Sequence, residues 1–159
     1  MEFKNGQLDF KKDIVTGEEG EAFIRGFLEN LGFKFISDCK NNAYDLKMSF
    51  KGKEYTYEVK TDTYEKNTGN MAIEFESRGK LSGLSVTQAD YFTYFFPLWG
   101  EIWNIRTEDL RKLIKKSNPY IHNGGDKGSN TFFYLLRKKD VTKYFKVHKV
   151  EPRNSQVQS

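Results

Sequence analysis

Two acidic residues and a lysine near the middle of the chain have the types and spacing needed for metal-assisted hydrolysis. Asp45 precedes Glu58, and Lys60 follows Glu58 by two positions. Carboxylates placed close together either share a proton or hold a cation, and oxygen ligands of this kind suit Mg²⁺. A bound Mg²⁺ stabilises charge on a phosphate and lowers the pKa of a water, while a lysine can orient that water or offset developing negative charge. These residues therefore predict a site that could hydrolyse a phosphodiester.

Two segments with alternating polar and apolar residues are expected to position these side chains. They span residues 43–50 and 53–60 and are joined by Lys51-Gly52, which is typical of a two-residue turn. The predicted hairpin pairs the two residues that flank this turn. A slip of one residue would mix its polar and apolar faces, so the pattern predicts the register as well.

This register places Asp45 directly opposite Glu58, with Lys60 on the same polar face. An antiparallel hairpin with one solvated face is the alternative interpretation. Like charges directly opposite each other destabilise a sheet, however, and solvated faces prefer opposite charges. The opposed carboxylates therefore favour a functional site over a solvated face.

The segment before the hairpin is predicted to be a helix that carries a further acid. Residues 17–31 contain one apolar stripe at helical spacing, and Gly32 is a plausible stop. At the helical spacing of residues, Glu21 lies about 90° from the centre of this stripe, closer than Glu18 or Glu19. Glu21 is therefore expected at the edge of the core, facing the sheet.

Asp45 followed after a hairpin by Glu58-Val59-Lys60 resembles the PD-(D/E)XK nuclease superfamily. The preceding stretch GEEGEAFIRGFLENLGF, with its acid at Glu21, is similar to the first core helix of archaeal Holliday-junction resolvases. The stretch NMAIEFESRGKLSGLSVTQADYFTYFF is similar to phage-encoded members. The resemblance covers roughly residues 17–96 and departs at Tyr44, which stands at the position of the family's proline.

This resemblance implies a restriction-endonuclease-like core with the order αβββαβ and a Mg²⁺-dependent DNA endonuclease that also accepts Mn²⁺. Asp45, Glu58, the Val59 carbonyl and Glu21 would be the metal ligands, and Lys60 would act on the attacking water. Because the helix acid resembles that of resolvases, branched or structured DNA is the expected substrate. Such enzymes usually act as symmetric dimers, so a homodimer is expected.

Three further residues are candidates for binding nucleic acid. The strand predicted at residues 70–76 is expected beside Glu58, which would place Arg78 and Lys80 in a loop near DNA phosphates. Gln88 lies in a short helix predicted at residues 85–90, which starts with Ser and Thr cap candidates, and some relatives direct a glutamine there at DNA or the metal-bound water. A plain basic loop is an equally simple interpretation of the two cations.

Length and composition agree with one domain that closes its own core. The chain has 159 residues, a net charge of +4, 37% hydrophobic and 16% aromatic residues. We expect an N-terminal arm at 1–16, a nuclease domain at 17–151 and a disordered tail at 152–159. The single cysteine, Cys39, excludes an internal disulfide and a multi-cysteine zinc site.

The alternation of predicted elements favours an α/β domain in which helices flank a mixed central sheet. No apolar run approaches the roughly 18 residues of a membrane helix, so a cytoplasmic protein is expected, in the host cytoplasm if it is phage-encoded. Two alternatives to a nuclease stay open. One is a non-catalytic nucleic-acid-binding or assembly module on the same fold, and the other is a structural protein with an incidental acid cluster.

Overall fold

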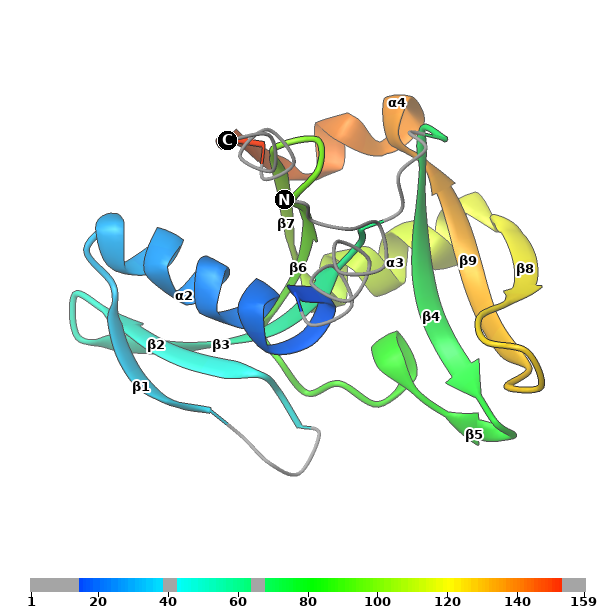
Figure 1. Cartoon of the computed structure of the whole chain (residues 1–159), viewed down its shortest axis with the longest axis horizontal. Helices are drawn as coiled ribbons and strands as arrows, with labels where there is room; N and C mark the ends of the chain where they lie inside the picture. Colours follow the sequence, from blue (N-terminus) through cyan, green and yellow to red (C-terminus); the bar gives the residue numbers. More distant parts are fainter. Residues whose placement is uncertain (1–14, 39–42, 64–67, 153–159) are drawn as a thin grey trace, which may run out of the picture.

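Two β-sheets organise the computed structural model, which describes residues 15–38, 43–63 and 68–152 (Figure 1). The first sheet has the order β1 (Lys34–Asp38), β2 (Leu46–Phe50), β3 (Lys53–Thr61), β6 (Tyr91–Phe96), β7 (Glu101–Arg106) and β10 (Lys146–Lys149). The second sheet has the order β5 (Lys80–Leu81), β4 (Asn70–Ser77), β9 (Thr131–Arg137) and β8 (Tyr120–Gly124). Most of the predicted arm and the tail from residue 153 onward lie outside the described residues.

Helices are few and short. They are η1 (Val15–Glu19), α2 (Gly20–Asn30), η2 (Gly83–Ser85), α3 (Thr107–Ser117), α4 (Lys138–Val141) and η3 (Thr142–Tyr144). The first sheet is mixed, because β3 and β6 are parallel while its other neighbouring strands are antiparallel. The chain therefore forms an α/β domain with a mixed sheet, as predicted. No helix in the described ranges is long and apolar enough to cross a membrane.

The predicted hairpin and its register are confirmed. Phe50 pairs with Lys53, and the ladder continues with no shift between β2 and β3. Lys51 and Gly52 have φ values of 51° and 82°, which is the geometry of a tight hairpin turn that needs positive φ at both positions. Met48 and Val59 lie on the buried face of this hairpin. The polar face is therefore left to carry the candidate site.

α2 covers the apolar face of the first sheet and ends at Asn30, shortly before Gly32. The Gly32 N–H donates to Glu29 O and the Phe33 N–H to Leu28 O, both at 3.0 Å, and Gly32 has φ of 103°. These paired bonds satisfy carbonyls at the helix end and require a residue that tolerates positive φ. The α-helix begins at Gly20 after the π-helical turn η1, three residues later than the start predicted at residue 17.

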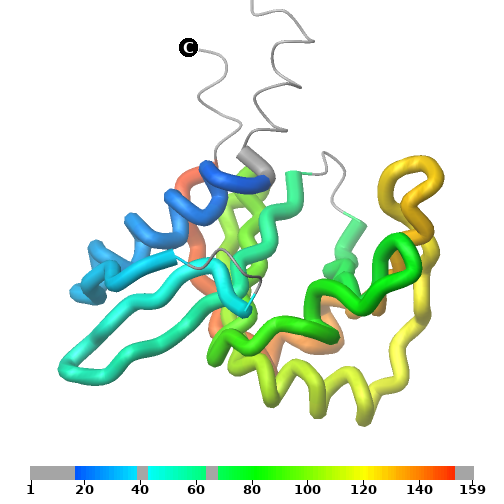
Figure 2. Tube along the Cα trace, turned by 90° about the horizontal axis from the view of Figure 1, so that it is seen from below, coloured from blue at the N-terminus to red at the C-terminus, as the bar shows by residue number. Residues whose placement is uncertain are grey.

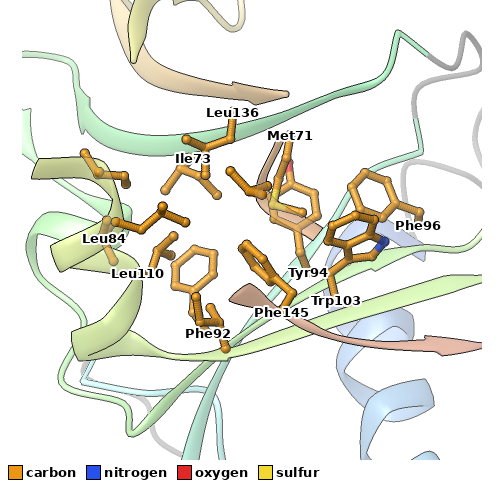
Figure 3. Packing of buried hydrophobic residues seen from close by; sticks show 14 residues of the cluster. Met71, Ile73, Leu84, Phe92, Tyr94, Phe96, Trp103, Leu110, Leu136 and Phe145 are labelled. Atoms are coloured by element: carbon orange, nitrogen blue, oxygen red, sulfur yellow. The ribbon is translucent and has the colours of Figure 1, made fainter. Parts of the chain in front are cut away.

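A second core lies between the two sheets. Met71, Ile73 and Leu136 of the second sheet pack toward Phe92 and Tyr94 of β6, and Figure 3 shows these side chains meeting between the sheets. Leu110, Leu113 and Ile114 of α3 belong to the same cluster. In the view from below, the β2–β3 hairpin and the β8 region lie at opposite ends of the molecule (Figure 2).

The connection between the parallel strands β3 and β6 differs from the predicted αβββαβ order. It runs through β4, β5 and η2, and the helix predicted at residues 85–90 is wrong, because only Gly83–Ser85 forms a short 3-10 turn. The expectation that the strand at 70–76 lies beside Glu58 is also wrong. β3 pairs with β2 and β6, whereas β4 pairs with β5 and β9 in the second sheet.

Candidate active site

Asp45 lies where the hairpin ladder ends. Its N–H donates to Tyr57 O at 2.8 Å, which extends the β2–β3 pairing by one residue. Its carboxylate oxygen Oδ2 accepts the Val59 N–H at 2.7 Å. Burial raises the pKa of the Asp45 carboxyl, while the Val59 N–H and the Lys60 ammonium oppose this rise. The side chain is thus fixed to β3 beside Glu58 and Lys60.

Glu58 is held from two sides. Its Oε1 accepts the Thr87 hydroxyl at 2.8 Å, and its Oε2 lies 3.6 Å from Lys60 Nζ. The Glu58 side chain is only 12% exposed, against 35% for Lys60. Burial and the charge of Asp45 raise the pKa of the Glu58 carboxyl, against the opposing effects of Lys60 and Thr87. A carboxylate with so little solvent needs such partners to stay ionised.

Glu21 lies in the first turn of α2, whose first residue, Gly20, approaches Thr61 of β3. Its pKa is raised from 4.5 to about 7, first by burial and then by the charges of Asp45 and Glu58, with smaller effects of Asp38 and Glu18. Glu21 is therefore within range of the charges of both hairpin acids. The predicted position of Glu21 at the edge of the core agrees with its partial burial.

Gly20 explains how α2 comes so close to β3. A Cβ on Gly20 would lie 2.0 Å from Thr61 Oγ1, so only glycine allows the helix to approach the strand here. Thr61 follows Lys60 directly, and Glu21 follows Gly20. The contact of Gly20 with the Thr61 side chain therefore brings the start of α2, which carries Glu21, close to the end of β3.

The donor chemistry of this group suits Mg²⁺, which binds oxygen and is usually held by one or two carboxylates and several waters. Asp45 and Glu58 are the two hairpin carboxylates beside Lys60, and burial is the largest cause of the raised pKa of each, with the charge of Asp45 adding to that of Glu58. Within the described ranges, no three His, Cys, Asp or Glu residues are grouped so that they could hold a metal ion. The site thus provides two carboxylate donors for a metal ion rather than a cluster of three acids.

Thr87 and Arg111 were not among the predicted site residues. The Thr87 hydroxyl reaches Glu58, and the Arg111 guanidinium on α3 donates from Nη2 to Leu84 O at 2.7 Å and to Thr87 O at 2.8 Å. Arg111 therefore anchors the segment that brings Thr87 to the acid. No sequence motif marks either residue; a threonine in an extended link is a weak signal until its partner is known.

The predicted nucleic-acid-binding residues fall in two places. Gln88 lies next to the site, because its N–H donates to Ala43 O at 2.8 Å, but it stands in an extended link rather than a helix. Arg78 and Lys80 lie at the β4–β5 turn, where Arg78 and Gly79 have φ of 54° and 77°. Both cations are exposed and belong to the second sheet. Contrary to the prediction, strand pairing therefore does not place them beside Glu58.

Comparison with known proteins adds no relative from which a role could be transferred. No family model, no curated protein and no solved structure matches the chain. The class of protein must therefore be argued from the geometry of the site.

Proposed function

We propose that the chain is a metal-dependent DNA endonuclease of the PD-(D/E)XK type. The observation that carries this proposal is the pairing of the partly buried Asp45 and Glu58 beside Lys60, with Glu21 within range of their charges. Such a grouping of acids is unfavourable for the fold, and groups of this kind mark functional sites. The resemblance of the Asp45…Glu58-Val59-Lys60 pattern to this superfamily supports the same class.

Each residue has a role that follows from its place. Asp45 and Glu58 would hold Mg²⁺, with the Val59 carbonyl as a further ligand by resemblance. The ion, when bound, would stabilise charge on the phosphate and lower the pKa of a water. Lys60 is partly exposed beside Glu58, so its ammonium can reach both a water and a phosphate oxygen. Glu21 at the rim would bind a second ion or a water.

The substrate proposal is branched or structured DNA cut by a homodimer. It rests on the resemblance of the α2 acid to that of resolvases and on the need for two matched cuts at a four-way junction. The net charge of +4 is compatible with a nucleic-acid partner.

A non-catalytic nucleic-acid-binding module on the same fold is the second candidate. Protein partners for both hairpin acids favour it, because Asp45 is bonded to the Val59 N–H and Glu58 to Thr87. In that case Asp45 would stabilise the hairpin itself, and Glu58 would connect it to the link before β6.

A cleavage panel separates the two candidates. Purified protein is incubated with duplex, single-stranded, flap and four-way-junction DNA in Mg²⁺, Mn²⁺, Ca²⁺ or EDTA. We expect cleavage with Mg²⁺ or Mn²⁺, little turnover with Ca²⁺ because its looser coordination positions water poorly, and none with EDTA. Full activity in EDTA would contradict the proposed site, and binding without cleavage in every metal would favour the binding module.

Lys60→Ala tests the lysine. We expect DNA affinity to be nearly unchanged while turnover falls by about 100-fold or more, because its charge acts mainly in the transition state. Lys47→Ala is the matched control, since Lys47 stands on the same hairpin and contacts the exposed Glu54 at 3.9 Å. An active Lys60→Ala enzyme would remove this lysine from the mechanism.

A further inference from the structure

A cavity of about 430 Å³ lies between α3 and the second sheet, apart from the three carboxylates. Its size falls in the range of roughly 300–1,000 Å³ typical of small-ligand sites. The walls come from β4, η2, α3, β8 and β9, so the cavity joins parts of the chain that are distant in sequence. None of these wall residues takes part in the proposed cleavage chemistry.

One wall of the cavity is aromatic. Phe75 of β4 and Tyr134 of β9 stack with their ring centroids 4.2 Å apart and their planes inclined by 25°. Both rings are only half-buried, so part of each remains open to a ligand. Ile121 of β8, which is 50% exposed, adds apolar surface. Stacking on such rings is the usual way in which proteins bind a planar base without sequence preference.

The facing wall is cationic. Arg111 and Lys115 lie one turn apart on α3 and both line the cavity, and no acidic residue is among its lining residues. Neither cation forms an ion pair with a carboxylate in the part of the chain that the structure describes. Arg111 uses Nη2 for Leu84 O and Thr87 O, which leaves the donors on Nε and Nη1. Two uncompensated cations of this kind suit a phosphate.

Asn118 completes the polar lining. It stands just after α3 with φ of 47°, and its exposed side-chain amide has no hydrogen-bond partner among the described residues. A free amide offers a donor and an acceptor together, which is what the edge of a nucleobase requires. The cavity thus combines a ring wall, an amide and two cations.

We propose that this cavity is a nucleotide-binding site, in which Phe75 and Tyr134 contact the base and Arg111 and Lys115 bind the phosphate. It goes beyond the proposed cleavage function, since the site contains none of the carboxylates. The same chemistry is offered by a free mononucleotide and by one nucleotide of a DNA strand, and the experiment distinguishes these two sources.

The test is calorimetric titration of the full chain in EDTA with AMP, ribose 5-phosphate and a single-stranded oligo(dA). We expect AMP to bind at least about fivefold more tightly than ribose 5-phosphate, because the base contributes stacking. Lys115→Gln should weaken AMP binding about fivefold through loss of one charged contact. Glycine tolerates the positive φ at this position, so Asn118→Gly should weaken the binding of AMP but leave the binding of ribose 5-phosphate unchanged.

Lys112→Gln is the matched control, because Lys112 is on the same helix but is 71% exposed and pairs with Glu108 at 3.4 Å. It should bind AMP as the wild type does. If oligo(dA) loses the same factor as AMP in Lys115→Gln, the nucleotide belongs to a DNA strand; if only AMP responds, it is a free nucleotide. The proposal is overturned if AMP fails to bind at millimolar concentration, binds no better than ribose 5-phosphate, or is insensitive to both cavity variants.

These outcomes are independent of cleavage. EDTA removes the metal on which the proposed cleavage depends, so nucleotide binding is measured with the hydrolytic site inactive. Binding of AMP without DNA cleavage would support the nucleotide site and contradict the nuclease proposal. DNA cleavage without binding of AMP would support the nuclease proposal and contradict the nucleotide site.

Discussion

Replacing Glu21 with Gln tests the raised pKa of this carboxyl, which burial and the charges of Asp45 and Glu58 cause together. The pKa of Glu21 is raised from 4.5 to about 7 in the folded protein. At low pH the carboxyl is protonated in both states. As the pH rises from about 4.5 to 7, the unfolded chain releases its proton while the folded protein retains it, so the free energy of unfolding falls over this range. Glu21→Gln should abolish that fall.

The magnitude follows from the same pKa. One pKa unit corresponds to about 1.4 kcal/mol, so the rise to about 7 sets an upper bound of about 3 kcal/mol. Because the side chain is only half-buried, solvent screening reduces the expected effect to about 1 kcal/mol. For a domain of this size, that amounts to roughly 2–4 °C in melting temperature.

Thermal melts in EDTA between about pH 4.5 and 8 provide the assay. The variant should melt with the wild type at the acidic end and above it at the alkaline end. Mg²⁺ should raise the melting temperature of the wild type, because it binds the folded state. Glu19→Gln is the control, since Glu19 is exposed and does not shift the pKa of Glu21. A gap that is absent or reversed at the alkaline end would refute the raised pKa of Glu21.

Three other substitutions test the parts of the site. Asp45→Asn should abolish cleavage yet leave metal-free stability unchanged or higher by about 1 kcal/mol, because it removes one charge and still accepts the Val59 N–H. Asp45→Ala leaves that N–H without an acceptor, so its free energy of unfolding in denaturant melts should be lower by about 1–3 kcal/mol. Thr87→Val should lower turnover without lowering DNA affinity, since Glu58 loses its donor, and Thr87→Ser should restore it in the same cleavage assay. Gly20→Ala should destabilise the fold by about 1–3 kcal/mol through the clash with Thr61, and adding Thr61→Ala should recover part of the loss. Equal stability of Asp45→Asn and Asp45→Ala, full activity of Thr87→Val, or a Gly20→Ala protein as stable as the wild type would contradict the respective argument.

The hairpin was predictable because its determinants are local. Alternation sets the two faces, and Lys51-Gly52 allows the positive φ that a two-residue turn requires. The end of α2 was predictable for the same reason, since Gly32 adopts a positive φ there. The site residues on these elements, Glu21 among them, followed from their position on a face or stripe.

The second sheet was not predictable from patterns of this kind. Alternation identifies the strand at residues 70–76, but it cannot say that this strand pairs with residues 131–137 rather than with β3. β8 was missed altogether, because Tyr120, Ile121 and His122 are all exposed and burial imposes no period of two on them. Pairing between strands distant in sequence is decided by the packing of whole faces, which single segments do not reveal.

The incorrect helix at residues 85–90 has a physical cause. Its Ser and Thr residues suggested caps, but both hydroxyls bind elsewhere: Ser85 Oγ donates to Phe75 O at 2.7 Å, and Thr87 Oγ1 donates to Glu58 Oε1 at 2.8 Å. Side chains of this type can bond to a helix end, to a loop carbonyl or to another side chain, and the sequence alone does not distinguish these outcomes.

The chain segment between β3 and β6 connects the candidate site to the second sheet. It leaves the first sheet after Thr61, contributes β4 and β5 to the second sheet, and returns through Thr87 to the polar face that it left. Arg111 of α3 holds this return segment by two carbonyls, and α3 itself packs into the core between the sheets. Because the partner of Glu58 is anchored in that second core, packing of the sheets also determines how the acid is oriented.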